Sequence, residues 1–188
     1  MARATASTRS TTKATAAKKP TPREGAARSK KENAENGFVA SERLTGDLQR
    51  VLVDLIELSL QAKQAHWNVV GKNFRDLHLQ LDEITESARE FSDVVAERLR
   101  ALHAAVDGRS AFVSETTSLP PYPNGEVATS DTVDLITVRL EAVVGTMRDV
   151  HDEVDEEDPT TADILHEIIS TLEQYAWMVS AENRTPSV

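Results

Sequence analysis

Four segments of this sequence repeat apolar residues at alternating steps of three and four positions. This spacing places apolar side chains along one face of an α-helix, where other helices can bury them. The first stripe consists of Leu44, Leu48, Val51, Leu55, Leu58, Ala62, Ala65 and Val69. The other three run from Leu77 to Leu99, from Val133 to Val154 and from Leu165 to Val179. With no strand signal beside them, these stripes predict an all-α four-helix bundle.

The first two helices are expected at about 41–70 and 73–106. Ser41 is the predicted N-cap of the first, and Gly71 ends it. A second apolar stripe lies on the opposite side of the first helix, and its residues are Ile56, Leu60 and Trp67. A helix that is apolar on two sides is buried on two sides, so this stripe predicts a subunit contact.

A long connection, residues 108–130, separates the second and third helices and contains several prolines. Twenty-three residues without a helical pattern are long for a compact domain. Such a segment can cross the length of a bundle, so that the second and third helices run parallel, as in ferritin-like folds. The third helix is expected to start near Ser130 or Asp131. The fourth is expected to start at a capping box formed by Thr160 and Asp163.

Charge divides the chain into a basic arm and an acidic body. Residues 1–36 carry nine basic and three acidic side chains, a net charge of +6, which leaves −16 for the remaining 152 residues. The arm lacks Leu, Ile, Val and aromatic residues, so it cannot bury enough surface to fold. We therefore expect a disordered arm at 1–36, a helical domain at 37–182 and a short polar tail at 183–188.

Three roles are open for the arm. Sequence-independent DNA binding through phosphate contacts is favoured by its charge. The expected DNA-contacting residues are Lys13, Lys18, Lys19, Arg23, Arg28, Lys30 and Lys31. A solvated tail that only aids solubility, or a transit peptide, would have a similar composition. The transit peptide is disfavoured because the arm has no large apolar residues to form an amphipathic face.

Cysteine is absent, so neither disulfides nor thiolate metal sites are possible. No apolar run approaches the ~20 residues of a membrane span, and the N-terminus shows no apolar core of a signal peptide. These observations predict a soluble cytoplasmic protein without a membrane partner.

Five potential metal ligands lie between Lys63 and Glu97. They are His66, His78, Asp82, Asp93 and Glu97. His78 and Asp82 are four residues apart, as are Asp93 and Glu97, so each pair shares a helix face. Imidazole with carboxylate suits iron, manganese or zinc. The pair His78–Asp82 alone would more often be a surface ion pair, so the metal prediction depends on all five positions.

One straight helix cannot bring both pairs to one ion. Asp82 and Asp93 are separated by eleven positions, roughly 16 Å of helix, whereas metal–oxygen bonds are about 2 Å long. Either the chain has two sites, or the two halves meet across a two-fold axis between copies. The second arrangement is favoured because these side chains lie away from the apolar stripe of their own helix.

These residues also carry a resemblance to a known family. The segments KQAHWNVVG, FRDLH and DVVAER resemble the signature of the Dps family, the mini-ferritins known as DNA-binding proteins from starved cells. The segment TADILHEI and the following LEQYAWMV resemble that family's last helix, so the similarity covers about residues 42–182. It implies a ferritin-like bundle with an inter-subunit ferroxidase site. His66, His78 and Asp82 would come from one subunit, and Asp93 and Glu97 from its two-fold partner.

The resemblance also implies an activity and an assembly. The protein would oxidise Fe(II), with hydrogen peroxide preferred over oxygen, and store ferric iron in a hollow homo-oligomeric shell, a dodecamer. The arm would bind DNA, which implies association with the nucleoid. Two alternatives remain open: a structural nucleoid-compacting protein with a vestigial metal site, and an iron-storage shell that does not bind DNA.

Lys63 and Trp67 flank His66 and are candidate catalytic residues. Trp67 could supply an electron during peroxide reduction, or it could simply pack at the interface, as its stripe position favours. Lys63 could modulate the site electrostatically, or merely cover its edge.

An acidic cluster at 149–158 ends the third helix and contains seven acids. It could be a solvated helix end, although acids there oppose the helix dipole. The resemblance places it beside a negatively charged three-fold pore, and Asp149, Asp152 and Glu153 are our candidates for iron entry.

The remaining histidines have weaker patterns. His103 and His151 are expected on exposed helix surface. Asp163 and His166 are three apart and could bind a metal, but a surface pair is the expectation. No Glu lies three residues before any histidine, which argues against a di-iron site within one bundle.

Overall fold

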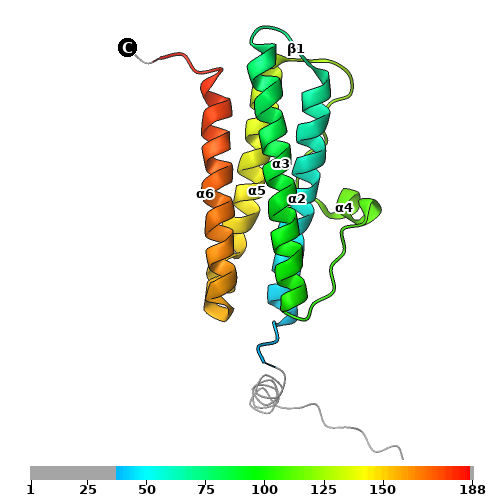
Figure 1. Cartoon of the computed structure of the whole chain (residues 1–188), viewed down its shortest axis with the longest axis vertical. Coiled ribbons are helices and arrows are strands. Elements are labelled where there is room, and N and C mark those ends of the chain that lie inside the picture. The colour runs from blue at the N-terminus through cyan, green and yellow to red at the C-terminus, as the bar shows by residue number, and fades with distance from the viewer. Residues whose placement is uncertain (1–36, 187–188) are drawn as a thin grey trace, which may run out of the picture. The chain divides into compact units, whose positions relative to one another are not determined.

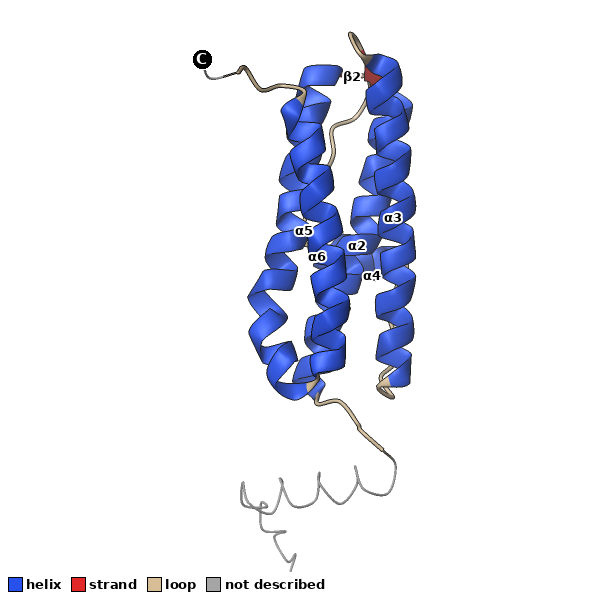
Figure 2. Cartoon of the chain, turned by 60° about the vertical axis from the view of Figure 1, so that its left-hand side comes forward, coloured by secondary structure: helices blue, strands red, loops and turns tan. Residues whose placement is uncertain are grey.

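The structure, a computed structural model, describes residues 37–186, which form a bundle of four long helices (Figures 1 and 2). The long helices are α2 (Glu42–Asn68), α3 (Phe74–Ala101), α5 (Thr129–Glu157) and α6 (Pro159–Ala181). A short helix, α4 (Ser110–Thr116), lies in the connection between α3 and α5. The predicted all-α ferritin-like bundle is confirmed. The basic arm and its expected DNA contacts lie outside the described residues.

The first two helices begin where the sequence predicts. Ser41 is the N-cap of α2, and its Oγ accepts a hydrogen bond from the Leu44 amide at 3.1 Å. Helix α3 ends at Ala101, earlier than the predicted Val106. His103 follows with a φ of 67°, a left-handed conformation that does not continue a helix.

The start of α6 differs from its prediction. The expected capping box at Thr160 and Asp163 is wrong, because the helix begins at Pro159 with Asp158 as its N-cap. Proline suits the first helical position, where its missing N–H would have no partner. The Asp158 carboxylate accepts hydrogen bonds from Thr161 and from Arg98 of α3. Burial raises the pKa of Asp158, but these two bonds, the charge of Arg98 and a hydrogen bond from the Thr160 backbone together leave the pKa below its usual value.

Helices α3 and α5 run in the same direction because the connection between them crosses the bundle lengthwise (Figure 1). Two short parallel strands, β1 (Val69–Val70) and β2 (Val127–Ala128), pair at the end where both helices begin. Gly71 follows β1 with a φ of 130°, and a Cβ there would lie 3.0 Å from Thr129 Oγ1. A larger residue would therefore push the α2–α3 turn away from the start of α5. The crossover was predicted, but the strand pair was not.

A buried carboxylate on α2 holds the middle of the crossover. Asp54 is almost fully buried and accepts hydrogen bonds from Thr117 Oγ1, from both the amide and the hydroxyl of Ser118, and from Thr146 Oγ1. The four distances lie between 2.6 and 2.9 Å. A buried charge is costly without such partners, so these bonds fix the path of the crossover between α2 and α5.

A buried cation on α5 holds the next part of the crossover. Arg139 is 1% exposed and donates to the carbonyl oxygens of Pro120 and Pro121 at 3.1 and 2.9 Å. Its guanidinium also lies 5.1 Å from the centre of the Tyr122 ring. Two successive parts of the crossover are thus bonded to buried side chains of α2 and α5.

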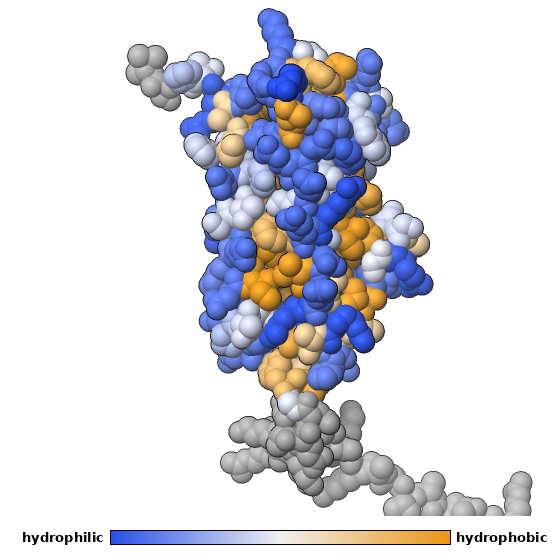
Figure 3. Space-filling model, viewed as in Figure 1, coloured by the Kyte–Doolittle hydropathy of each residue, from blue (hydrophilic) through white to orange (hydrophobic). Residues whose placement is uncertain are grey.

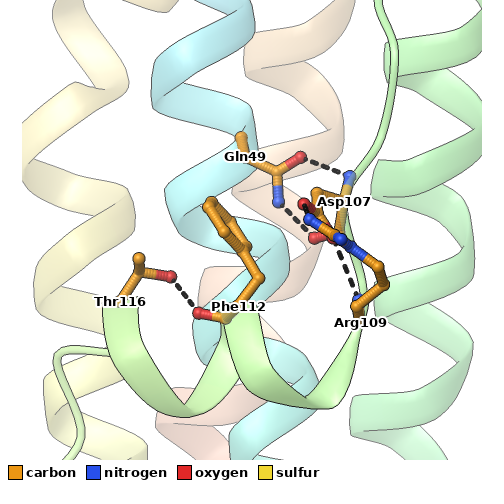
Figure 4. A network of polar contacts seen from close by, with 5 residues as sticks. All are labelled: Gln49, Asp107, Arg109, Phe112 and Thr116. Carbon is orange, nitrogen blue, oxygen red and sulfur yellow. Dashed lines mark hydrogen bonds and ion pairs between the residues drawn. The ribbon is translucent and has the colours of Figure 1, made fainter.

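The side-chain amide of Gln49 holds the start of the crossover by bonding both backbone groups of one residue (Figure 4). Gln49 of α2 donates to the Asp107 carbonyl at 2.8 Å and accepts from the Asp107 amide at 2.9 Å. The Asp107 carboxylate accepts hydrogen bonds from Arg109, just before α4. The crossover is therefore ordered from its first residues.

The predicted apolar stripes form the core, but the second stripe of α2 divides in two. Ile56 is half-buried within the chain beside Gly108, and its expected subunit contact stays a prediction. Leu60 and Trp67 are 52% and 68% exposed. Nowhere in residues 37–186 is a helix long and apolar enough to cross a membrane.

Candidate metal centre

Two histidines meet beside the turn that joins α2 to α3. His66 lies in the last turn of α2, and His78 lies in the second turn of α3. Their rings stack, with centroids 3.7 Å apart and planes inclined by 21°. The Nδ1 atom of each ring lies 2.9 Å from the backbone carbonyl oxygen of the other residue. The two side chains therefore hold the helix ends together reciprocally.

This bonding selects one tautomer for both rings. A carbonyl oxygen can only accept a hydrogen bond, so each Nδ1 must carry hydrogen and donate it. In a neutral imidazole the Nε2 then keeps a free lone pair. Metal-binding histidines commonly donate their other ring N–H in this way. His66 and His78 are therefore held in a form that can bind a metal through Nε2.

Asp82 lies one helical turn beyond His78 and next to Lys63. Its Oδ1 forms an ion pair with Lys63 Nζ and lies 3.4 Å from His66 Nδ1. The Lys63 hydrogen bond, more than any other contact, lowers the pKa of Asp82. Asp82 is therefore an ionised carboxylate at neutral pH, and a metal would compete with Lys63 for it.

Asp93 and Glu97 lie farther along α3, and both are exposed. Their four-residue spacing puts them on one side of the helix. Within residues 37–186 no group of three or more His, Asp or Glu side chains is arranged to hold a metal ion. His66, His78 and Asp82 thus gather without converging on one point, and a site shared between two chains stays a prediction.

The two candidate catalytic residues lie side by side on α2. Lys63 Nζ is 6.0 Å from the centre of the Trp67 ring, at the outer limit of a cation–π contact. Trp67 is mostly exposed, so it is available for packing against another molecule. Its role at an interface and its role in electron transfer both remain predictions.

The three acids proposed for iron entry differ in their surroundings. Asp149 and Asp152 are exposed on α5. Glu153 instead forms an ion pair with Arg43 at the start of α2. Asp149 and Asp152 therefore remain candidates for attracting cations, while Glu153 has a partner that offsets its charge.

The remaining histidines do not all lie where the sequence suggests. His103 is exposed, but it follows the end of α3 and does not lie on helix surface. His151 is half-buried against His166, which corrects its expected place on exposed helix surface. The two Nε2 atoms are 2.6 Å apart. His151 precedes the Asp158 turn by seven residues and His166 follows it by eight. This nearly equal separation from the turn is the sequence signal that could have paired them.

Comparisons with known proteins match most of the chain. A family model described as a ferritin-like domain matches residues 46–185. The DNA protection during starvation protein 2 of Deinococcus radiodurans is 36% identical over 134 residues, which are 71% of this chain. The matched region spans just over half, 56%, of that relative's length.

Two solved structures are similar in both fold and sequence. A Dps protein from Deinococcus radiodurans is 34% identical with a TM-score of 0.74, and the match covers 77% of this chain and 88% of that one. A Dps from Microbacterium arborescens, solved in its high-iron form, is 29% identical with a TM-score of 0.72. This second match covers 78% of this chain and 98% of the other.

Proposed function

This chain belongs to the Dps family of ferritin-like proteins, and we propose that it oxidises Fe(II) and stores the ferric product inside a shell of its own copies. The observation that carries the proposal is the gathering of His66, His78 and Asp82 at the α2–α3 hairpin. Fe(II) is the substrate, and imidazole with carboxylate suits it. The high-iron form of the Microbacterium relative supports the same ion.

The residues of the half-site have distinct roles in this proposal. His66 and His78 bind through Nε2, because backbone carbonyls hold their Nδ1–H groups. Asp82 adds a negative charge, which favours Fe(III) over Fe(II) and so promotes the loss of an electron. Hydrogen peroxide is the proposed oxidant: it takes one electron from each of two ferrous ions and two protons from solvent, and is reduced to two molecules of water. Both reactants that generate hydroxyl radical are consumed together.

A second copy of the chain completes the site in this proposal. Asp93 and Glu97 are exposed and distant from the half-site in their own chain, so a two-fold partner would supply them. Large apolar side chains are exposed on α2 and α3, including Leu60, Trp67 and Val94. Figure 3 shows several apolar groups on the face that carries α3. Burying them would favour association, and repetition of such contacts would build the shell, proposed to be a dodecamer.

The ferroxidase proposal is tested with the double variant His66→Ala/Asp82→Ala. Loss of two ligands should lower the initial rate of Fe(II) oxidation by hydrogen peroxide by at least about a hundredfold, since even an outer-shell change costs 10–100-fold. Anaerobic stopped-flow absorbance of the ferric product measures the rate. The matched control is His103→Asn, which replaces an exposed histidine by a residue that tolerates its left-handed backbone. A double variant as fast as the parent would favour a nucleoid-compacting protein with a vestigial site.

DNA binding is the second part of the proposal, and it depends on the charge of residues 1–36. The arm carries +6 and the remainder of the chain −16, so the body alone should repel DNA. Many arms on one shell would bind with avidity, even if each made only weak phosphate contacts. The proposed contacts are Lys13, Lys18, Lys19, Arg23, Arg28, Lys30 and Lys31. The proposed location is the nucleoid.

Deleting residues 1–36 separates the two activities. Retardation of DNA in a gel should disappear, because the remaining protein carries a net charge of −16. Fe(II) oxidation should stay within about twofold of the parent. The intact protein should lose retardation steeply as salt rises, since each neutralised phosphate releases counterions. Retardation that survives the deletion would show that the body binds DNA. Absence of retardation in the intact protein would support a storage shell alone.

A further inference from the structure

A second pair of histidines joins α5 to α6, apart from the five ligands discussed above. His151 and His166 turn their Nε2 atoms toward each other at 2.6 Å, with ring centroids 4.5 Å apart. Without a metal, one Nε2 must carry hydrogen and donate it to the other. Both nitrogens therefore point into the same small space between the two helices.

The outward nitrogen of each ring lies near a carboxylate. His151 Nδ1 is 3.2 Å from Asp152 Oδ1, and His166 Nδ1 is 3.8 Å from Asp163 Oδ1. A carboxylate on one ring nitrogen commonly orients a histidine whose other nitrogen binds a metal, and it makes that nitrogen more basic. Only the two imidazoles therefore face the point between the Nε2 atoms, and each has a carboxylate on its outer side.

The surroundings favour a cation at this point. A shallow pocket lined by Arg148, His151, Asp152, His166 and Ile169 opens to solvent beside the pair. Arg148 is its one cationic lining residue apart from the histidines, and its guanidinium is paired with Glu173. The charge of Arg148 is therefore offset, while the exposed carboxylates of Asp152 and Asp163 add negative charge beside the pair.

We propose that His151 and His166 are the paired ligands of a second metal site that bridges α5 and α6 and takes a late first-row divalent ion such as Zn²⁺ or Cu²⁺. Imidazole pairs favour these ions over Fe(II) in the general order of affinities. Zn–N bonds of about 2.0–2.1 Å at a tetrahedral angle place two nitrogens roughly 3.3 Å apart. The rings must therefore open by about 0.7 Å, which is easy for His166 because its side chain is 59% exposed. Water would fill the remaining positions, as suits an exchangeable ion.

The test uses the full-length assembled protein and Zn²⁺ alone. Crystals soaked in Zn²⁺ should show an anomalous peak between the two Nε2 atoms, and the peak should persist in the His66→Ala/Asp82→Ala variant. Equilibrium dialysis at neutral pH should show one Zn²⁺ fewer per chain in His151→Gln/His166→Gln than in the parent. The control His103→Asn should bind as much as the parent. An unchanged Zn²⁺ count in the double variant, or a peak only at other residues, overturns the proposal.

Two single variants complete the test. His166→Gln serves if the double variant does not fold, and Asp152→Asn tests the orienting carboxylate. If the double variant does not assemble, the single change His166→Gln at a mostly exposed position should still weaken Zn²⁺ binding at this site at least tenfold. Asp152→Asn keeps the size of the side chain but removes its charge, and it should weaken binding about tenfold. Binding as tight as in the parent for both variants would also overturn the proposal. The result is independent of the ferroxidase proposal, because the variants of His151, His166 and Asp152 leave the five ligands at the other end unchanged.

Discussion

The two ends of the bundle each hold a histidine pair between neighbouring helices, and the two pairs are bonded in opposite ways. At the α2–α3 end, both Nδ1 atoms donate to backbone carbonyls and the rings stack. At the α5–α6 end, the two Nε2 atoms face each other and the Nδ1 atoms lie near carboxylates. Figure 1 shows that the two hairpin turns lie at opposite ends.

The two pairs differ in whether one chain alone can supply the ligands of a metal site. His66 and His78 have their Nδ1 atoms bonded to the backbone, but within residues 37–186 Asp82 is the only carboxylate paired with either ring. His151 and His166 already face a common point within one chain. The first pair therefore resembles half of a shared site, and the second resembles a small site that one chain can form alone. Three experiments sharpen or break this comparison.

The largest effect is expected when two defective chains are mixed. One chain carries His66→Ala/Asp82→Ala and the other Asp93→Ala/Glu97→Ala, and each alone should be nearly inactive. In a mixed pair across a two-fold axis, one site has both defects and the other has none. Random mixing of equal amounts should therefore restore about a quarter of the parental rate of Fe(II) oxidation. Co-expression followed by stopped-flow assay measures it, and no recovery in a correctly assembled mixture would place the whole site within one chain.

A smaller effect is expected at Lys63. Its ammonium group is paired with Asp82, the carboxylate beside the α2–α3 histidine pair. Lys63 lowers the pKa of Asp82, so the carboxylate stays ionised to lower pH than usual. Lys63→Met should raise that pKa toward its ordinary value and move the acid limb of the rate–pH profile to higher pH. At neutral pH the same variant should bind Fe(II) several-fold tighter, because no ammonium competes for Asp82.

The matched control at this position is Lys63→Arg, which keeps the positive charge. It should leave the acid limb close to that of the parent. A Lys63→Met profile that coincides with the parental one would mean that Asp82 does not control the acid limb.

The smallest effect is expected at the α5–α6 pair in the absence of metal. His151→Gln/His166→Gln removes the hydrogen bond between the two rings and their contacts with the exposed Asp152 and Asp163. These groups are accessible to water, so the free energy of unfolding should change by less than about 1 kcal/mol. Urea denaturation of chelator-treated protein measures it. A decrease of several kcal/mol in the free energy of unfolding would mean that the pair is a structural contact of the bundle. The two pairs would then not differ in the way described above.

Most of the fold could be predicted because helical periodicity repeats over long segments. The four apolar stripes and the Ser41 N-cap follow from local rules, and the crossover follows from its length. The β1–β2 pair could not be predicted, because two residues per strand are too few to show a period. The capping box failed because Thr160 and Pro159 both signal a helix start, and proline together with Asp158 determined the first residue.

The site was predictable in part for similar reasons. The spacing of His78 and Asp82 is a property of one helix, so it could be read from the sequence. The Nδ1 partners of His66 and His78 are backbone carbonyls, which leave no mark in the sequence. His151 was misjudged because its partner, His166, lies on another helix. The buried charges Asp54 and Arg139 were missed because both depend largely on groups of the irregular crossover.

The strand pair β1–β2 has a consequence for the order in which the chain folds. His66 and His78 are 12 residues apart, so their hairpin closes at a small cost in chain entropy. Val69 and Val127, which pair in the strands, are separated by 58 positions. They can meet only after α3 has formed and the crossover has returned along the bundle to the start of α3. During synthesis the histidine pair can form before β2 has left the ribosome. A weakened strand pair should then speed unfolding more than it slows folding.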